Sequence, residues 1–232
     1  MAHLQFPGLL PQASRSQHSE SRTNKVCLIG SGGGKNANKY LQTHKPQQNT
    51  LKNRNKKLKM ASWNIRTLLT SSAVANTTPR RTALVARELA RYDVDIAALQ
   101  ETHLKESGQL EEVGEGYTFI WSGCKDTEAN YYGVAICVKT KLLKNGTITN
   151  PVCLSDRIMH LEINGKHEKT TFICAYAPTL PSSSSEKEIF YQELRNVVDS
   201  IATNHQVIIA GDFNARVGKN SEIWGDVLGR HG

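Results

Sequence analysis

The sequence predicts an α/β fold, and three observations carry this prediction. Two short apolar runs, Val94–Leu99 and Val207–Ala210, have the length and composition of buried strands. Each is preceded by a segment with helical periodicity, and helices that alternate with strands are typical of a sheet flanked by helices. Each run is followed by a carboxylate, Glu101 or Asp212. Ligand sites in such folds form where strands end, so one polar site fed from several strands is expected.

The first predicted elements are a strand at Leu58–Ile65 and a helix. Thr78 is placed as the N-cap of this helix, with Pro79 at the first helical position. Its apolar residues recur at intervals of three and four, which is the spacing of a buried stripe, at Val85, Leu89 and Tyr92. The helix is expected to end at Asp93, before the Val94–Leu99 strand.

The middle of the chain reads as further strands. Tyr117–Trp121 and Gly133–Val138 are apolar and rich in β-formers. Arg157–Ile163 and Thr170–Tyr176 are predicted to form a hairpin, because Asn164-Gly165 is a strong signal for a two-residue turn.

A second helix is expected after a serine-rich loop. Ser185 and Glu188 have the spacing of a capping box. The buried stripe of this helix falls at Phe190, Leu194, Val197 and Ile201, and the chain then returns to the strand Val207–Ala210.

The stretch that follows, Gly211-Asp212-Phe213-Asn214, carries the strongest chemical signal. Gly211 allows a tight turn or a close backbone approach. In extended chain, Asp212 and Asn214 point to the same side. A hard cation such as Mg²⁺ takes oxygen ligands, and an asparagine beside it can hold a phosphate oxygen or a water. The alternative is that Gly-Asp-x-Asn is a simple turn after a strand.

Charge divides the chain of 232 residues into two parts. Residues 1–59 contain 11 Lys+Arg and 1 Asp+Glu, whereas the remainder has a net charge of −2. Residues 1–56 are also rich in Ser, Gln, Asn and Gly, so we predict a disordered basic tail at 1–56 and a folded domain at 57–232. The cluster between Lys52 and Lys59 is interpreted as a solvated linker, a nuclear-import signal or a phosphate-contacting arm.

Several other sites are excluded by spacing. Lys25–Lys35 resembles a strand entering a phosphate loop, but its glycine spacing does not fit and Asn36 follows the lysine. The 5 cysteines form no C-x-x-C pair, which argues against a zinc site or a disulfide framework. Pro7 and Gly8 interrupt the apolar N-terminal stretch, so neither a signal peptide nor a membrane span is expected. We therefore expect a protein that is intracellular, nuclear or cytoplasmic, and not secreted.

Four motifs in order then resemble those of the endonuclease/exonuclease/phosphatase superfamily. They are Trp63-Asn64-Ile65-Arg66, Leu99-Gln100-Glu101-Thr102, Tyr176-Ala177-Pro178 and Gly211-Asp212-Phe213-Asn214. The segment after Asn64 is most similar to the retrotransposon-type endonucleases and the craniofacial development protein 2-like proteins. This resemblance implies a four-layer α/β sandwich of two facing mixed sheets flanked by helices. It also implies cleavage of phosphate esters with Mg²⁺ or Mn²⁺.

The resemblance assigns a role to each matching residue. Glu101 corresponds to the metal ligand, with Asn64 as its partner on the first strand. Tyr176 approaches the scissile phosphate, Asp212 orients or deprotonates the attacking water, and Asn214 stabilises the transition state. Arg66 and Asn214 are expected to bind substrate.

Two departures from the family pattern shape the functional prediction. Arg66 stands where the DNA-repair branch has an acidic residue, which argues against abasic-site repair. The family's C-terminal Asp and Asp-His pair have no counterpart before Gly232, and His231 has no partner carboxylate. The last strands of the fold are therefore expected to be missing, with a raw sheet edge and weak or no activity in this fragment.

The main functional prediction is a metal-dependent endonuclease-like hydrolase acting on nucleic acid, most naturally DNA. The alternatives are a non-catalytic nucleic-acid-binding protein and a phosphatase of the same superfamily. The sequence does not choose between DNA, RNA and small phosphates as substrate, and its pattern carries no signal for an oligomeric state.

Overall fold

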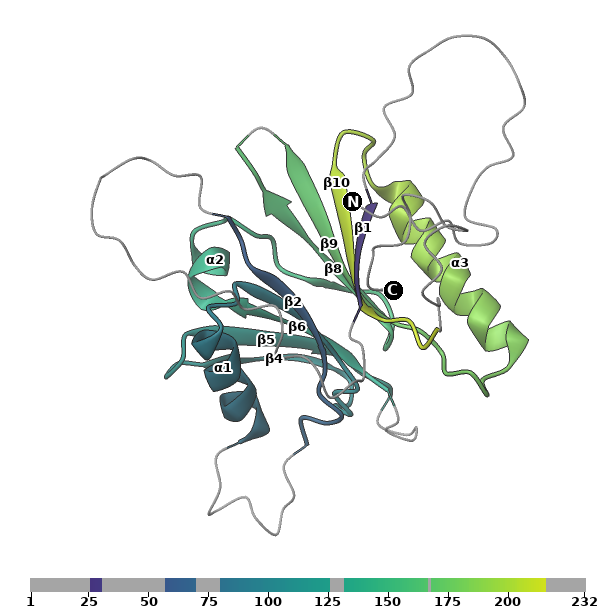
Figure 1. Ribbon diagram of the computed structural model, residues 1–232, viewed down its shortest axis with the longest axis horizontal. Helices are drawn as coiled ribbons and strands as arrows, with labels where there is room; N and C mark the ends of the chain where they lie inside the picture. The colour runs from purple at the N-terminus through teal and green to yellow at the C-terminus, as the bar shows by residue number, and fades with distance from the viewer. Residues whose placement is uncertain (1–25, 31–56, 70–79, 126–131, 167, 216–232) are drawn as a thin grey trace, which may run out of the picture.

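Two mixed sheets stand at the centre of the molecule (Figure 1). The structure is a computed structural model that describes residues 26–30, 57–69, 80–125, 132–166 and 168–215. Within these ranges each sheet has five strands. The first, called here the β2 sheet, has the order β2 (Met60–Asn64), β3 (Ile96–Gln100), β6 (Val134–Lys139), β5 (Tyr117–Ser122) and β4 (Ser107–Glu112). The second, the β10 sheet, has the order β1 (Val26–Gly30), β10 (Gln206–Asp212), β9 (Lys169–Tyr176), β8 (Ile158–Asn164) and β7 (Val152–Cys153).

The helices cover the outer faces of the two sheets. Helix α1 (Arg81–Arg91) packs Val85, Ala86 and Leu89 against the outer face of the β2 sheet. Helix α3 (Ser184–Ser200) packs Phe190 and Leu194 against the outer face of the β10 sheet. A short helix, α2 (Thr140–Lys144), follows β6. The predicted four-layer sandwich is therefore confirmed, with the order helix, sheet, sheet, helix (Figure 1).

The central core lies between the sheets. Ile96, Ile136 and Val138 of the β2 sheet meet Leu161 and Phe172 of the β10 sheet, and all five are fully buried. Both faces of β3 and β6 are covered, which is why their sequences are continuous apolar runs without alternation. Burial of this apolar surface is the main stabilising contribution to the fold.

Four strands deliver their carboxyl ends to one edge of the sandwich. β2 and β3 run parallel in one sheet, and β9 and β10 run parallel in the other. Their last residues therefore lie in register, with Asn64 beside Gln100 and Tyr176 beside Asp212. This edge carries the candidate site.

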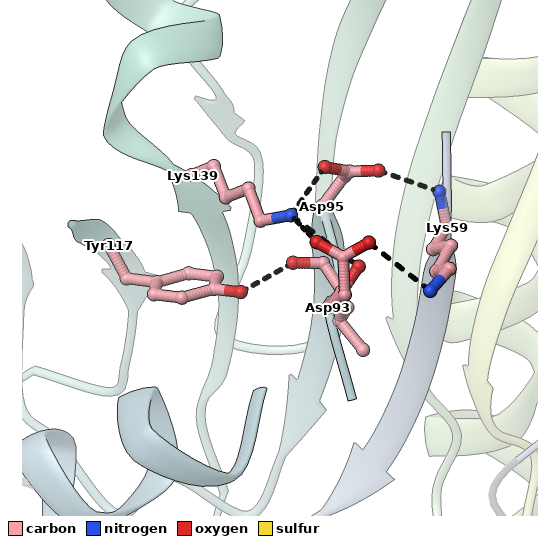
Figure 2. A network of polar contacts seen from close by, with 6 residues as sticks. Lys59, Asp93, Asp95, Tyr117 and Lys139 are labelled. Carbon is pink, nitrogen blue, oxygen red and sulfur yellow. Dashed lines mark hydrogen bonds and ion pairs between the residues drawn. The ribbon is translucent and has the colours of Figure 1, made fainter. Parts of the chain in front are cut away.

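The opposite end of β3 is fixed by a network of charged groups (Figure 2). The ammonium of Lys139 lies between Asp93 and Asp95, at 2.5 and 2.8 Å from their carboxylate oxygens. Asp95 also accepts the backbone N–H of Lys59 at 2.9 Å, and the hydroxyl of Tyr117 donates to the carbonyl of Val94. The network joins β2, β5 and β6 to the turn before β3.

Three sequence predictions about element boundaries are wrong. Helix α1 begins at Arg81 with Arg80 as N-cap, so its start is later than predicted, and Thr78 and Pro79 lie outside the described residues. The capping box of α3 is formed by Ser183 and Glu186, because the serine run offers the same spacing two residues earlier.

The third correction concerns the hairpin between β8 and β9. Asn164 is still paired with Lys169, so Asn164-Gly165 does not form a two-residue turn between the strands. The two strands extend further than the turn signal implied, because their backbone pairing continues past Ile163.

The strand suggested by the sequence of Lys25–Lys35 is present within the predicted tail. Val26–Gly30 is strand β1 and pairs in parallel with β10, from Val26 beside Val207 to Gly30 beside Gly211. The reason is that this short run has β-forming composition and β10 offers an open edge for backbone hydrogen bonds. The rest of the predicted tail, residues 1–25 and 31–56, lies outside the described residues.

None of the helices in the described ranges is long and apolar enough to cross a membrane.

Candidate active site

Four polar side chains meet where β2, β3, β9 and β10 end. Asn64 is the last residue of β2, Glu101 directly follows β3, Tyr176 ends β9 and Asp212 ends β10. These residues come from both sheets and from positions up to 148 apart in the chain. The structure thus brings together the residues that the sequence motifs single out.

The amide of Asn64 joins the two carboxylates. Its nitrogen Nδ2 donates to Glu101 Oε1 at 2.8 Å and to Asp212 Oδ2 at 3.1 Å. Its oxygen Oδ1 accepts the backbone N–H of Arg66 at 3.1 Å, which fixes the orientation of the amide. Asn64 therefore presents donor hydrogens to the carboxylates and turns its oxygen away from them.

Tyr176 completes the contacts of Glu101. Its hydroxyl donates to Glu101 Oε1 at 3.0 Å, and the residue is 3% exposed. Burial, together with the nearby charge of Glu101, raises the pKa of the Tyr176 hydroxyl to about 12. The phenol therefore stays protonated at neutral pH and acts as a hydrogen-bond donor.

The Asp212 carboxylate is held by the turn that follows it. The backbone N–H of Asn214 donates to Asp212 Oδ1 at 3.0 Å, and the Asn214 amide nitrogen donates to the carbonyl of Ala177 at 2.7 Å. Asn214 lies beyond the end of β10 with φ 47, so its alignment with Asp212 comes from this turn and not from extended chain.

Gly211 permits the close approach that its sequence position suggested. A Cβ at this residue would lie 1.9 Å from the carbonyl oxygen of Ala175 on β9. Any larger residue would push β10 away from β9 and move Asp212 out of register with Tyr176.

Left-handed backbone conformations are concentrated at this edge. Arg66 (φ 63), Glu101 (φ 57), His103 (φ 56) and Asn214 (φ 47) all adopt them without being glycine. Such conformations cost on the order of 1–3 kcal/mol each and persist where surrounding contacts fix them. They turn the chain sharply after β2, β3 and β10, which directs Glu101 toward Asn64 and not along β3.

Arg66 lies at the rim of the site. Its backbone N–H orients Asn64, whereas its side chain is exposed. The residue is therefore adjacent to the carboxylates, where an extended substrate could reach its guanidinium.

The site fits a hard divalent cation. Mg²⁺ binds proteins through one or two carboxylates and completes its shell with water and substrate phosphate. Glu101 and Asp212 supply two carboxylates that share one amide donor, so they lie close together. Within the described residues, no three or more His, Cys, Asp or Glu side chains are grouped so that they could hold a metal ion, so the two carboxylates would need water and substrate phosphate to complete the shell.

Sequence reasoning missed Gln100, the last residue of β3, which directly precedes Glu101. Gln100 is fully buried, accepts the hydroxyl of Ser62 at 3.3 Å and contacts the Cys174 sulfur at 3.7 Å across the two sheets. A fully polar side chain in an apolar strand was the available signal. His231, the remaining histidine candidate, lies outside the described residues.

Comparisons with known proteins identify the family. Its sequence profile, described as the Endonuclease/Exonuclease/phosphatase family, matches residues 61–226. The match includes all four motif segments and more than half of the chain. The chain belongs to the endonuclease/exonuclease/phosphatase family.

A curated relative agrees with the expected branch. Craniofacial development protein 2 of Bos taurus is 29% identical over 173 residues, which is 75% of this chain and 26% of that protein. The chain thus spans about a quarter of the length of this relative.

Solved structures give weaker matches. A humanized form of TDP2 from D. rerio is 17% identical, with coverage of 74% of this chain and 67% of that one and a TM-score of 0.46. The endonuclease domain of TRAS1, a telomere-specific non-LTR retrotransposon, is 19% identical, with coverage of 58% and 53% and a TM-score of 0.42. The fold assignment rests on the two-sheet topology and the family match.

Proposed function

We propose that this chain is a divalent-metal-dependent phosphodiester hydrolase that nicks nucleic acid at a low rate, with DNA as its substrate. The observation that carries the proposal is the shared contact of Glu101 and Asp212 with the Asn64 amide. Two carboxylates at the ends of strands from different sheets, with a tyrosine and two asparagines around them, form a site for hydrolysis of a phosphate ester.

Glu101 and Asp212 are the groups that would hold Mg²⁺ or Mn²⁺. The bound cation supplies Lewis-acid stabilisation of the negative charge that develops on the phosphate. Asn64 offers its nitrogen to the carboxylates, so its role in the proposal is to position them. Its amide oxygen would reach the cation only after the amide turned and released the N–H of Arg66.

The remaining groups orient water and phosphate. Asp212 can accept a hydrogen bond from the attacking water, and its position is fixed by the Asn214 N–H. The second N–H of the Asn214 amide, beyond the one donated to Ala177, would bind a phosphate oxygen. The single O–H of Tyr176 would do so only after it released Glu101, which happens if Glu101 turns to a bound cation. Positioned donors of this kind each contribute on the order of 10²–10³ in rate.

The preference for a nucleic acid over a small phosphate rests on the charge of the N-terminal segment. Residues 1–59 carry a net charge of +10, which suits a long polyanion better than a small phosphate. In this proposal the segment acts as an electrostatic arm for the hydrolytic domain, because the rest of the chain has a net charge of −2.

The test is nicking of supercoiled plasmid by the full chain with Mg²⁺. Glu101→Gln and Asp212→Asn remove a charge while keeping the shape of the side chain, so each is expected to lower the rate on the order of 10²–10⁴. Glu188→Gln is the matched control, because it removes a carboxylate from an exposed position on α3. It should leave the rate unchanged.

Three outcomes discriminate between the functions. Nicking that is lost in both site variants but retained in the control supports the endonuclease. Release of phosphate from monoesters without nicking would favour the phosphatase. Absence of both activities, with Mg²⁺-dependent DNA binding intact, would favour a non-catalytic binding protein.

A further inference from the structure

Arg157 stands beside the site without belonging to any of the four motifs. It immediately precedes β8 and is bound to the end of β9 at two points. Its carbonyl accepts the N–H of Tyr176 at 2.9 Å, and its Nη1 donates to the carbonyl of Tyr176 at 3.2 Å. The guanidinium is therefore held next to the residue whose hydroxyl contacts Glu101.

Two aromatic rings, one from each sheet, hold the guanidinium group. Its central carbon lies 3.9 Å from the ring centre of Tyr132 and 5.5 Å from that of Tyr176. Tyr132 precedes β6 and is itself fixed, because its carbonyl accepts the N–H of His103 at 3.0 Å. Arginine over aromatic faces is a favourable arrangement that leaves the edge of the guanidinium plane open to hydrogen-bond acceptors.

The charge of Arg157 has no ion-pair partner among the described residues. Other arginines of the domain do have one, such as Arg80 with Glu112 and Arg91 with Glu88. Arginine has five N–H donors, and within the described ranges one of them is accepted, by the Tyr176 carbonyl. A half-buried guanidinium beside the tyrosine that contacts Glu101, with most of its donors not accepted by described residues, is poorly explained by packing alone.

We infer that Arg157 binds a backbone phosphate of the substrate adjacent to the scissile one. The guanidinium fork matches two oxygens of a phosphate, and the Tyr132 ring fixes the plane of the fork. In this role Arg157 is a substrate-positioning residue. This inference rests on the proposed function, since it names the contact that places the polyanion across the Glu101–Asp212 pair.

The test is binding of a fluorescent duplex oligonucleotide to the full chain in EDTA, at a series of salt concentrations. Each phosphate contact contributes about 0.9 to the slope of log K against log salt. Arg157→Gln is expected to lower this slope by about 0.9 and to weaken binding roughly 5- to 50-fold. Arg157→Lys should keep the slope, because it keeps the charge, but bind a few-fold more weakly because the fork is lost.

Arg195→Gln is the matched control, because it removes the same charge from the middle of α3. The inference is overturned if Arg157→Gln keeps the wild-type slope, or changes it only as much as Arg195→Gln does. Thermal unfolding distinguishes a structural role from phosphate binding. If Arg157 only linked the two sheets, Arg157→Gln would lower the melting temperature and leave the salt slope unchanged. If Arg157→Gln does not fold, the Arg157→Lys result decides, because a slope that falls with this variant contradicts a charge contact.

Binding in EDTA does not require catalysis, so the two proposals fail separately. A chain that never nicks plasmid but loses 0.9 of slope on Arg157→Gln would refute the hydrolase and keep the phosphate contact. A chain that nicks plasmid but keeps the wild-type salt slope in the Arg157→Gln variant would support the hydrolase and refute the phosphate contact.

Discussion

Asn64 separates two carboxylates that would otherwise face each other. Its amide nitrogen donates to both Glu101 and Asp212, and the Arg66 N–H keeps the amide from turning. The same two hydrogen bonds that position the carboxylates also reduce their mutual repulsion while no cation is bound.

Asn64→Asp should make the domain depend on divalent metal. The change removes the shared donor and adds a third carboxylate, so we expect the free energy of unfolding in EDTA to fall by roughly 1–3 kcal/mol. Excess Mg²⁺ should restore most of this loss, because it binds the enlarged acidic cluster. Urea unfolding with and without Mg²⁺ measures both quantities.

The control for this substitution is Asn150→Asp, which places the same charge at an exposed position. Equal metal-dependent gains in the two variants would show that Asn64 does not lie between the metal-binding carboxylates.

Tyr176 predicts a loss of stability at alkaline pH. Its pKa of about 12 in the fold exceeds the ordinary value of 10.0, so the folded state favours the protonated phenol. The stabilisation is complete below pH 10 and is lost as the pH rises through 12, on the order of 2 kcal/mol in total. Tyr176→Phe should therefore give a shallower fall in unfolding free energy between pH 10 and 12.

Tyr117 offers a comparison within the same molecule, because burial raises the pKa of its hydroxyl to about 12 as well. Tyr117→Phe should also reduce the fall in unfolding free energy between pH 10 and 12, while leaving nicking at neutral pH intact. An alkaline fall that is equally steep in wild type and in Tyr176→Phe would contradict the buried, protonated phenol.

At the scale of elements, the network at the start of β3 (Figure 2) joins segments that are distant in the sequence. Asp95 is 2% exposed and depends on Lys139 for neutralisation. Lys139→Met should cost about 3–5 kcal/mol, because it leaves a buried carboxylate without its cation. The double variant Lys139→Met/Asp95→Asn should recover part of this loss, and urea unfolding of the four proteins gives the coupling.

The same network predicts acid sensitivity. Hydrogen bonds from Lys139 and Lys59 lower the pKa of Asp93 from 3.8 to about 2. Its stabilising contribution is therefore present above pH 4 and is lost as the pH falls toward 2. Between pH 4 and pH 2, the free energy of unfolding should fall more steeply with decreasing pH for wild type than for Asp93→Asn.

The sequence predicted most elements because their signals are local. The strands before Glu101 and Asp212 are continuous apolar runs, and Phe190 and Leu194 mark the buried face of α3. The edge strand β4 has no such apolar run and was not among the predicted strands. Its residues are mostly exposed, and its buried Glu112 accepts hydrogen bonds from Thr82 and Arg80, which no local pattern reveals.

The residues of the candidate site also divide into those with a local sequence signal and those that only the packing of the strands reveals. Glu101, Tyr176 and Asp212 were predicted because each belongs to a motif at the end of a strand. Arg157 was missed because its two ring contacts come from different sheets, and only the packing of β6, β8 and β9 brings them together. The orientation of the Asn64 amide also required the structure, because sequence does not show which amide atom faces the carboxylates.

At the scale of the whole molecule, β1 changes the expected role of the tail. Its pairing covers the outer edge of β10, the strand that carries Asp212. The predicted raw edge of this sheet is thus occupied along β10 by a segment from the other end of the chain. The N-terminal segment therefore contributes a strand to the fold in addition to its positive charge.

Two shortened chains test this role. A chain that starts at residue 57 loses β1, so it should melt several degrees lower and self-associate through the exposed strand edge. A chain that starts at residue 23 keeps β1 and should behave like the full chain. Thermal unfolding and sedimentation measure both effects, and identical melting of all three proteins would show that β1 adds no stability.

The distance in sequence between Asn64 and Asp212 also sets when the site can exist. These two residues are 148 positions apart, and β10 is the last strand of the described chain to be synthesised. At 5–20 residues per second, a ribosome needs about 7 to 30 seconds to reach the second carboxylate after the asparagine has emerged. Glu101, 37 positions after Asn64, is added early in that interval, and Asp212 is added only at its end. The candidate site is therefore incomplete in a nascent chain until translation has passed β10.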